Sequence, residues 1–76
     1  GMWFRLYELR IAYQDKQLER VSELLSELLE AYPAHPEINK IAGDMYQLLG
    51  EKAESEAFYS LVNQVDPFHY AGPGEE

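Results

Sequence analysis

The stretch from Ala42 to Pro67 constrains the fold more than any other part of the sequence. Small, aromatic and apolar residues recur in it at helical spacing on both sides of Gly50, at Ala42, Gly43, Tyr46, Ser55, Tyr59 and Val62. Such spacing places side chains on one face of a helix, and a glycine between two such runs ends the first. The stretch therefore predicts two amphipathic helices that meet at Gly50 and end before Pro67.

A shift of 34 residues aligns the first half of the chain with the second half without a gap. The paired positions are Phe4 with Ile38, Tyr7 with Ile41, Ile11 with Met45, Leu24 with Phe58, Leu25 with Tyr59, Leu28 with Val62, and Pro33 with Pro67. A fixed period of this length indicates two copies of one helical unit.

The pattern Ala42-Gly43, Tyr46, Gly50, Ser55, Tyr59, Val62 and Pro67 resembles a tetratricopeptide repeat, a helix–turn–helix unit of 34 residues. The first half departs from this pattern at four positions, where Leu9, Ala12, Lys16 and Val21 stand in place of Gly43, Tyr46, Gly50 and Ser55. The resemblance implies an all-α fold of two antiparallel helical hairpins, a fragment of a right-handed solenoid. Because Leu9 and Val21 are larger than their counterparts, the first pair of helices should pack less closely than the second.

The sequence predicts four helices in a single domain that covers residues 2–76. Their ranges are 2–14, 17–31, 36–49 and 52–65, with breaks at 14–16, 32–35 and 50–51. Pro36 suits the first turn of a helix, and Gly50 suits a left-handed helix cap. In the fourth helix the residues expected to face inward are Ala53, Ala57, Phe58, Leu61, Val62 and Val65.

The two repeats are expected to cover residues 2–35 and 36–69. A disordered tail is expected over residues 70–76, because Ala71-Gly72-Pro73-Gly74 cannot continue a helix.

The charge and the composition narrow the classes of partner. The chain of 76 residues has a net charge of -8, which disfavours nucleic acid and anionic lipid as partners. No apolar run is long enough to cross a bilayer, and Arg5, Glu8 and Arg10 interrupt any signal-peptide pattern. The absence of cysteine fits a reducing compartment, so a cytoplasmic location is expected.

Residues that could carry catalysis or bind a metal do not form a recognisable pattern. The two histidines, His35 and His69, are one period apart, which is too far for one metal ion in stacked repeats. The serines lack a nearby histidine or a nucleophile-elbow context, and the glycines match a packing contact and a turn. The sequence therefore predicts a protein that is not an enzyme and needs no cofactor.

In the family that the chain resembles, the first helix of each repeat lines a concave groove. The resemblance implies groove residues Trp3, Leu6, Arg10, Tyr13 and Gln14 from the first repeat, and Glu37, Lys40, Asp44, Gln47 and Leu48 from the second. Some members of the family clamp a terminal carboxylate with lysine and asparagine. Asp44 stands where that asparagine would be needed, which argues against such a clamp here.

The first predicted helix is apolar on nearly every side, so a monomer of two repeats should leave Trp3, Leu6, Tyr7 or Tyr13 exposed. Stacked repeats bury their faces against neighbours, and a copy of the same chain is a neighbour that is always available. These residues therefore predict a homodimer with this helix at its interface. Trp3 could equally pack as a core residue at the start of the chain.

We therefore expect a non-catalytic protein-interaction or scaffold module that associates with itself. Its expected protein-binding residues are Trp3, Leu6, Tyr7, Arg10, Tyr13, Lys40, Asp44 and Gln47. One alternative is a peptide- or helix-binding adaptor that is part of a larger repeat protein. Another is a helical bundle that binds a small ligand with the aromatic cluster Trp3, Tyr7, Tyr13 and Tyr46.

Overall fold

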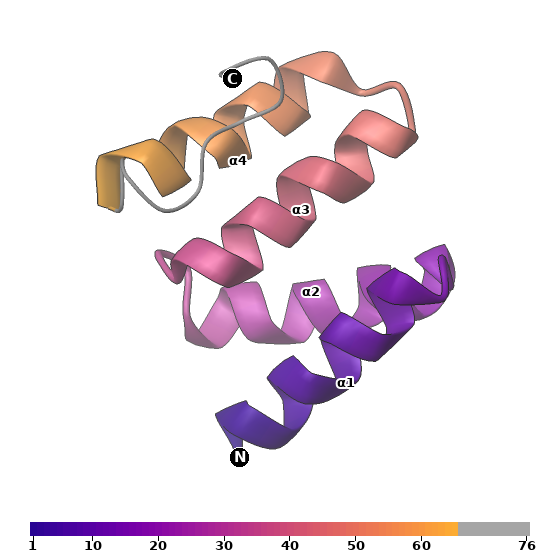
Figure 1. Cartoon of the computed structure of the whole chain (residues 1–76). Helices are drawn as coiled ribbons and strands as arrows, with labels where there is room; N and C mark the ends of the chain where they lie inside the picture. Colours follow the sequence, from indigo (N-terminus) through magenta and orange to yellow (C-terminus); the bar gives the residue numbers. More distant parts are fainter. Residues whose placement is uncertain (66–76) are drawn as a thin grey trace.

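Four α-helices occupy residues 1–65, the part of the chain that this computed structural model describes (Figure 1). They are α1 (Met2–Gln14), α2 (Leu18–Ala31), α3 (Pro36–Leu48) and α4 (Lys52–Val65). These residues contain no strand, so the predicted all-α fold is confirmed, and each helix begins and ends within one residue of its predicted place. His69 and the predicted tail over residues 70–76 lie outside the described part of the chain.

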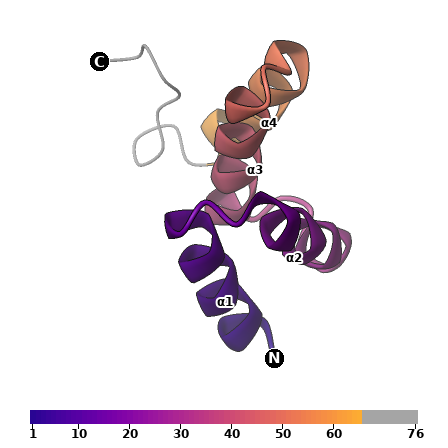
Figure 2. The same ribbon diagram turned by 90° about the vertical axis from the view of Figure 1, so that its right-hand side faces the viewer.

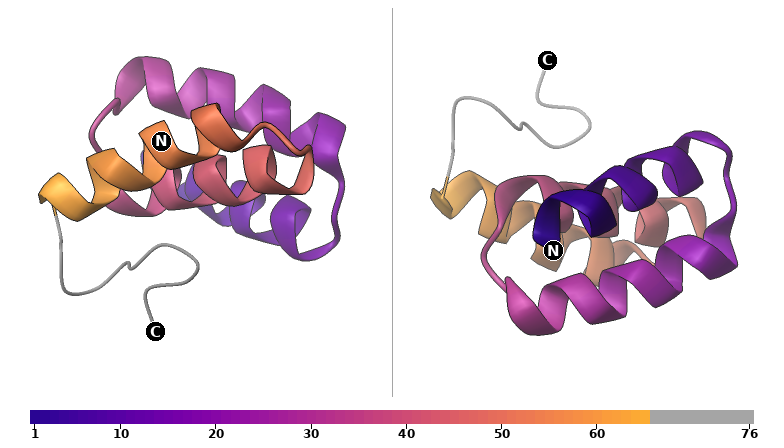
Figure 3. Two further views of the ribbon diagram at one scale, coloured as in Figure 1. Left: turned by 90° about the horizontal axis from the view of Figure 1, so that it is seen from above. Right: turned by 90° about the horizontal axis from the view of Figure 1, so that it is seen from below.

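The helices are stacked so that α1 and α4 lie at opposite ends and α2 and α3 between them (Figures 1 and 3). Packing follows the chain, with α1 on α2, α2 on α3 and α3 on α4. One end of the stack is thus formed by the outer side of α1, and the other end by α4 and the adjoining side of α3.

The turns that follow α1 and α3 share one backbone geometry. Lys16 has a φ of 57° and Gly50 a φ of 78°, both in the left-handed region. In each turn the next N–H, that of Gln17 or Glu51, donates to the carbonyl five residues earlier with an N···O distance of 2.9 Å. These bonds satisfy carbonyls that a helix end leaves open. The predicted left-handed cap at Gly50 is confirmed, and Lys16 adopts the same conformation without the freedom of glycine.

The turn between α2 and α3 is held by polar side chains. The ring Nδ1 of His35 accepts a hydrogen bond from the Ile38 N–H at 3.4 Å, so His35 caps α3. The amide of Asn39, which is 1% exposed, donates to the carbonyls of Pro33 and His35, both at 2.9 Å. The second half of the chain therefore starts from a fixed position relative to α2.

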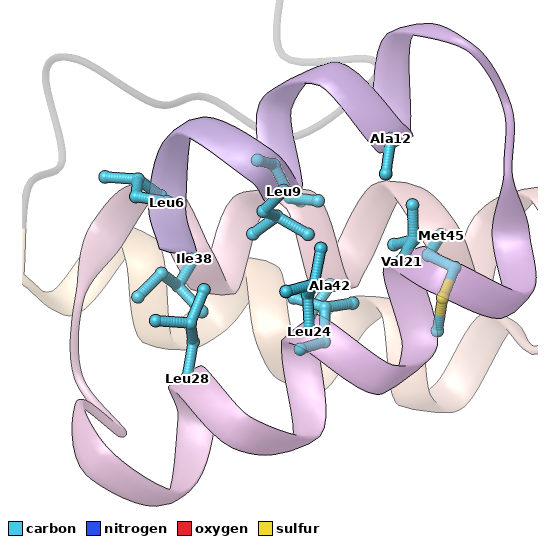
Figure 4. Close-up of a cluster of buried hydrophobic side chains, with 11 residues drawn as sticks. Leu6, Leu9, Ala12, Val21, Leu24, Leu28, Ile38, Ala42 and Met45 are labelled. Atoms are coloured by element: carbon cyan, nitrogen blue, oxygen red, sulfur yellow. The ribbon is translucent and has the colours of Figure 1, made fainter. Parts of the chain in front are cut away.

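The hydrophobic core lies among α1, α2 and α3 (Figure 4). Its buried members are Leu6, Leu9, Ala12, Val21, Leu24, Leu25, Leu28, Ile38, Ile41, Ala42 and Met45. They recur every three or four residues along each helix, as expected for faces that pack against neighbouring helices. The core side of α1 thus contains Leu6, Leu9 and Ala12.

The buried face of α4 differs from the predicted one. Of the residues expected to face inward, Ala53 and Ala57 are exposed, and Leu61 is 39% exposed. Ser55 and Tyr59 are buried instead, together with Val62, which was expected. The reason is that α4 packs on α3 beside Gly43, and residues 55, 59 and 62 form the helix face that meets this glycine.

Gly43 allows α3 and α4 to approach closely. A Cβ atom at this position would lie 2.5 Å from Cε1 of Tyr59, a distance that real contacts do not allow. The Ser55 hydroxyl donates to the Gly43 carbonyl at 2.8 Å in a buried hydrogen bond. α1 and α2 pack less closely than α3 and α4, as predicted, and Leu9 occupies the place in α1 that Gly43 has in α3 (Figure 2).

Replacing Gly43 by leucine is expected to lower the free energy of unfolding by on the order of 1–3 kcal/mol or more, because the side chain must push the Tyr59 ring away. Urea unfolding followed by circular dichroism measures the change. Ala57→Leu, on the exposed side of α4, is the control and should shift stability by no more than about 0.5 kcal/mol. Equal stability of the Gly43→Leu variant and the wild type would contradict the close packing.

The left-handed turns give a second stability test. Lys16→Gly should raise the free energy of unfolding by roughly 0.5–1 kcal/mol, because it removes the cost of an L-residue in this region. Gly50→Val should lower it by about 1–2 kcal/mol through the backbone alone, since a Cβ atom at Gly50 would have no neighbour within 4 Å. Thermal and urea unfolding measure both changes. Opposite signs for the two variants are the expected result, and a stabilising Gly50→Val would contradict it.

Candidate protein-interaction surfaces

One side of α1 presents large apolar side chains to solvent. The exposed fractions are 74% for Trp3, 64% for Phe4, 59% for Tyr7 and 41% for Ile11. Their spacing along the helix places these four residues, here called the α1 outer face, in a single stripe opposite the core. Trp3 and Tyr7 were predicted to be in the binding surface, and Trp3 is not a core residue.

Phe4 and Ile11 were not among the predicted binding residues. The 34-residue alignment did contain a signal for them, since it pairs them with the apolar residues Ile38 and Met45. Those counterparts are buried against the first half of the chain, whereas Phe4 and Ile11 have no preceding half to cover them.

Leu6 was wrongly predicted to be exposed at the binding surface. It is 1% exposed and belongs to the core, where it points toward the side chains of α2 and α3 (Figure 4). The physical reason is helical periodicity, because Leu6 shares a face with Leu9 and lies away from Tyr7. Leu6 therefore contributes to stability and offers no surface to a partner.

Phe4, Tyr7 and Ile11 line a shallow hollow of about 270 Å³ between α1 and α2. Two ion pairs border it, from Arg5 to Glu8 at 2.8 Å and from Arg20 to Glu8 at 3.2 Å. The hydrogen bond from Arg5 lowers the pKa of the Glu8 carboxyl. The rim of the α1 outer face therefore carries cations that already balance its acid.

A second concave surface lies between α1 and α3. This groove has a volume of about 540 Å³ and is lined by Arg10, Tyr13, Gln14, Glu37, Lys40, Ile41 and Asp44. It brings together four of the predicted binding residues, Arg10, Tyr13, Lys40 and Asp44, together with the neighbours Gln14 and Glu37. Gln47 is absent from this lining and accepts a hydrogen bond from the Tyr59 hydroxyl at 3.2 Å.

The charges of the groove are paired with one another. Arg10 bonds Glu37 with two parallel hydrogen bonds, Nε to Oε2 at 2.5 Å and Nη2 to Oε1 at 2.6 Å. Lys40 bonds Asp44 across one helical turn at 2.8 Å. Two cations thus meet two anions, and the bidentate pair joins α1 to α3.

Asp44 is the centre of a hydrogen-bond network that joins three helices. Its carboxylate accepts hydrogen bonds from the Tyr13 hydroxyl of α1 at 3.0 Å, from the Tyr59 hydroxyl of α4, and from Lys40 of its own helix. Burial, together with the bond to Asp44, raises the pKa of Tyr13 to about 12 and also raises the pKa of Tyr59. Both phenols are therefore protonated donors at neutral pH. The role of Tyr59 was not predicted, because only the folded chain brings it to Asp44.

The predicted aromatic ligand cluster is spread over separate surfaces. Trp3 and Tyr7 lie on the α1 outer face, and Tyr13 bonds Asp44 in the groove. Tyr46 stacks on Phe58, with ring centroids 5.5 Å apart, where α3 meets α4. These side chains therefore do not line a shared pocket.

Within residues 1–65, no three His, Cys, Asp or Glu side chains come together as metal ligands. None of the described helices combines the length and the apolar character needed to span a bilayer.

No known protein family, curated protein or solved structure matches this sequence. The resemblance to tetratricopeptide repeats therefore stays a prediction, and the geometry of the surfaces carries the functional argument.

The bond between Arg10 and Glu37 predicts a dependence of stability on pH. The hydrogen bond from Arg10 lowers the pKa of Glu37 in the folded protein, so the pair stabilises the fold above the unfolded pKa of about 4.3. This contribution is lost as the pH falls through the lower folded pKa. Glu37→Gln should therefore reduce the free energy of unfolding by up to about 1 kcal/mol at pH 7 and have little effect at pH 3.

Urea unfolding at both pH values tests this dependence. Glu56→Gln, which removes an exposed carboxylate of α4, is the control, and its effect should be small at pH 7. A Glu37→Gln effect of the same size at pH 3 and pH 7 would contradict the role of the ion pair.

Proposed function

We propose that this protein is a non-catalytic interaction module that associates with a second copy of itself through the α1 outer face. The observation that carries the proposal is the exposure of Trp3, Phe4 and Tyr7, each of which is between 59% and 74% accessible. A contiguous apolar patch on a folded protein usually marks a contact surface. Tryptophan and tyrosine are also among the residues that contribute most to binding energy at interfaces.

The groove between α1 and α3 supports the alternative, a peptide- or helix-binding adaptor, less well. Arg10 and Lys40 already bond Glu37 and Asp44, so a charged partner would have to compete with bonds inside the protein. Asp44 also holds the Tyr13 hydroxyl, and displacing it would loosen the contact of α1 with α3. The α1 outer face has no such competition, since its side chains are free to lose contact with water.

The proposed partner and setting follow from charge and composition. A net charge of -8 disfavours nucleic acid and anionic membranes, and it leaves protein as the favoured class of partner. Association through apolar contacts in a chain without cysteine suits a reducing compartment such as the cytoplasm. No cofactor is required for this function.

The proposal predicts that Tyr7→Asp abolishes self-association, because it places a charge at the middle of an apolar contact. Multi-angle light scattering from low to high micromolar concentration should give a mass that rises above the monomer for the wild type and stays at the monomer for Tyr7→Asp. Tyr32→Asp, an equal change at an exposed tyrosine at the end of α2, is the matched control and should behave like the wild type.

Circular dichroism of both variants confirms that they remain folded. A wild-type mass that stays at the monomer at every concentration would contradict self-association. A Tyr32→Asp variant that also loses association would contradict the assignment to the α1 outer face.

A further inference from the structure

The molecule contains its own example of how a face like the α1 outer face is covered. Phe4, Tyr7 and Ile11 align with Ile38, Ile41 and Met45 of α3 at the offset of 34 residues. Those three counterparts are 0%, 6% and 4% exposed, because they pack in the core against α1 and α2. A stripe of this pattern is therefore buried by another apolar helix surface and not by polar groups.

The other end of the stack does not provide such a surface. The core residues Leu6, Leu18 and Val21, which lie in or against the core that receives α3, align with Lys40, Lys52 and Ser55. At this end Lys52, Ser55 and Glu56 line a hollow of about 290 Å³ together with Gln47, Gly50 and Tyr59. Copies joined end to end would press Phe4 and Tyr7 against lysine and glutamate side chains and would remove those charges from water without a partner.

The α1 outer face is instead complementary to itself. Phe4 and Ile11 lie about one helical turn on either side of Tyr7, so two antiparallel α1 helices that cross near Tyr7 place Phe4 of one copy beside Ile11 of the other. Trp3 of each copy then extends over Gln14 of its partner, at the edge of the contact. This arrangement uses the same patch on both copies, which is the property of a twofold interface.

The distribution of charge also favours contact through α1. α1 contains Arg5, Arg10 and Glu8, a net charge of +1, whereas the whole chain carries -8. The remainder of the chain therefore carries -9. The charges of α2 and α1 at the rim of the face are Arg20, Arg5 and Glu8, which pair with one another. A twofold contact through α1 thus keeps the excess of acids away from the contact and limits repulsion between the copies.

The area of the face sets the expected strength of association. Large aromatic side chains bury about 150–250 Å² each, so the exposed parts of the four residues on two copies amount to on the order of 1,000 Å². This lies at the lower limit of specific interfaces. The dimer should therefore be weak and should dissociate at about micromolar concentration.

We infer that the α1 outer face is a twofold interface in which α1 of one copy packs antiparallel to α1 of a second copy, and that association stops at the dimer. This inference rests on the self-association proposed above. It goes further by naming the symmetry, the orientation and the residue pairs of the contact.

Cysteine cross-linking tests this arrangement directly, because the chain has no cysteine of its own. Phe4→Cys and Ile11→Cys are oxidised separately and as an equal mixture, at a concentration at which the wild type is dimeric. The expected result is a disulfide-linked dimer that is at least several-fold more abundant in the mixture than in either variant alone. A second pair, Gly1→Cys with Gln14→Cys, leaves all four apolar side chains intact and should give the same pattern. Lys52→Cys, at the polar end, should cross-link with none of them.

The outcomes separate the two proposals. A wild-type chain that is monomeric at every concentration contradicts the proposed self-association itself. If the wild type associates, cross-linking of Phe4→Cys with Lys52→Cys shows end-to-end contact and overturns only the twofold arrangement. Efficient cross-linking of each variant with itself shows parallel helices and overturns the antiparallel orientation. A mass that grows beyond the dimer with concentration overturns the closed interface.

Discussion

α1 has two apolar faces but lies at the end of a helical stack, where only one of them can be buried inside the molecule. Leu6 and Leu9 on the inner side contribute to the core with α2 and α3, and without them the stack would lose its first layer. Trp3, Phe4 and Tyr7 on the outer side stay exposed. The hydrophobic effect that holds the stack together therefore also leaves a surface that gains free energy from a partner.

The second half of the chain is held by a different device. Gly43 brings α4 close enough for Tyr59 to reach Asp44, and the same carboxylate holds Tyr13 of α1. The bond between Arg10 and Glu37 adds a second link between α1 and α3. These polar contacts fix the position of α1 relative to the rest of the molecule, so its outer face is presented by a rigid support.

The helices and most of the core could be predicted from the sequence, because periodicity, Pro36 and Gly50 are local signals. Local signals did not determine which side of a helix meets a neighbour. Leu6 was therefore placed at the surface, and the buried side of α4 was predicted around Ala57 although Ser55 and Tyr59 occupy it. The network at Asp44 depends on residues from three helices, so no spacing along the chain could have indicated it. Phe4 and Ile11 could have been found, since their aligned partners are apolar.

The emission of Trp3, the one tryptophan of the chain, tests the central claim most directly. This residue is 74% exposed in the single copy, so at nanomolar concentration its emission should be that of a solvated indole. As the concentration rises through the micromolar range, the emission maximum should shift to shorter wavelength when a second copy covers the α1 outer face. An emission maximum that stays at the solvated position from nanomolar to several hundred micromolar would contradict the account.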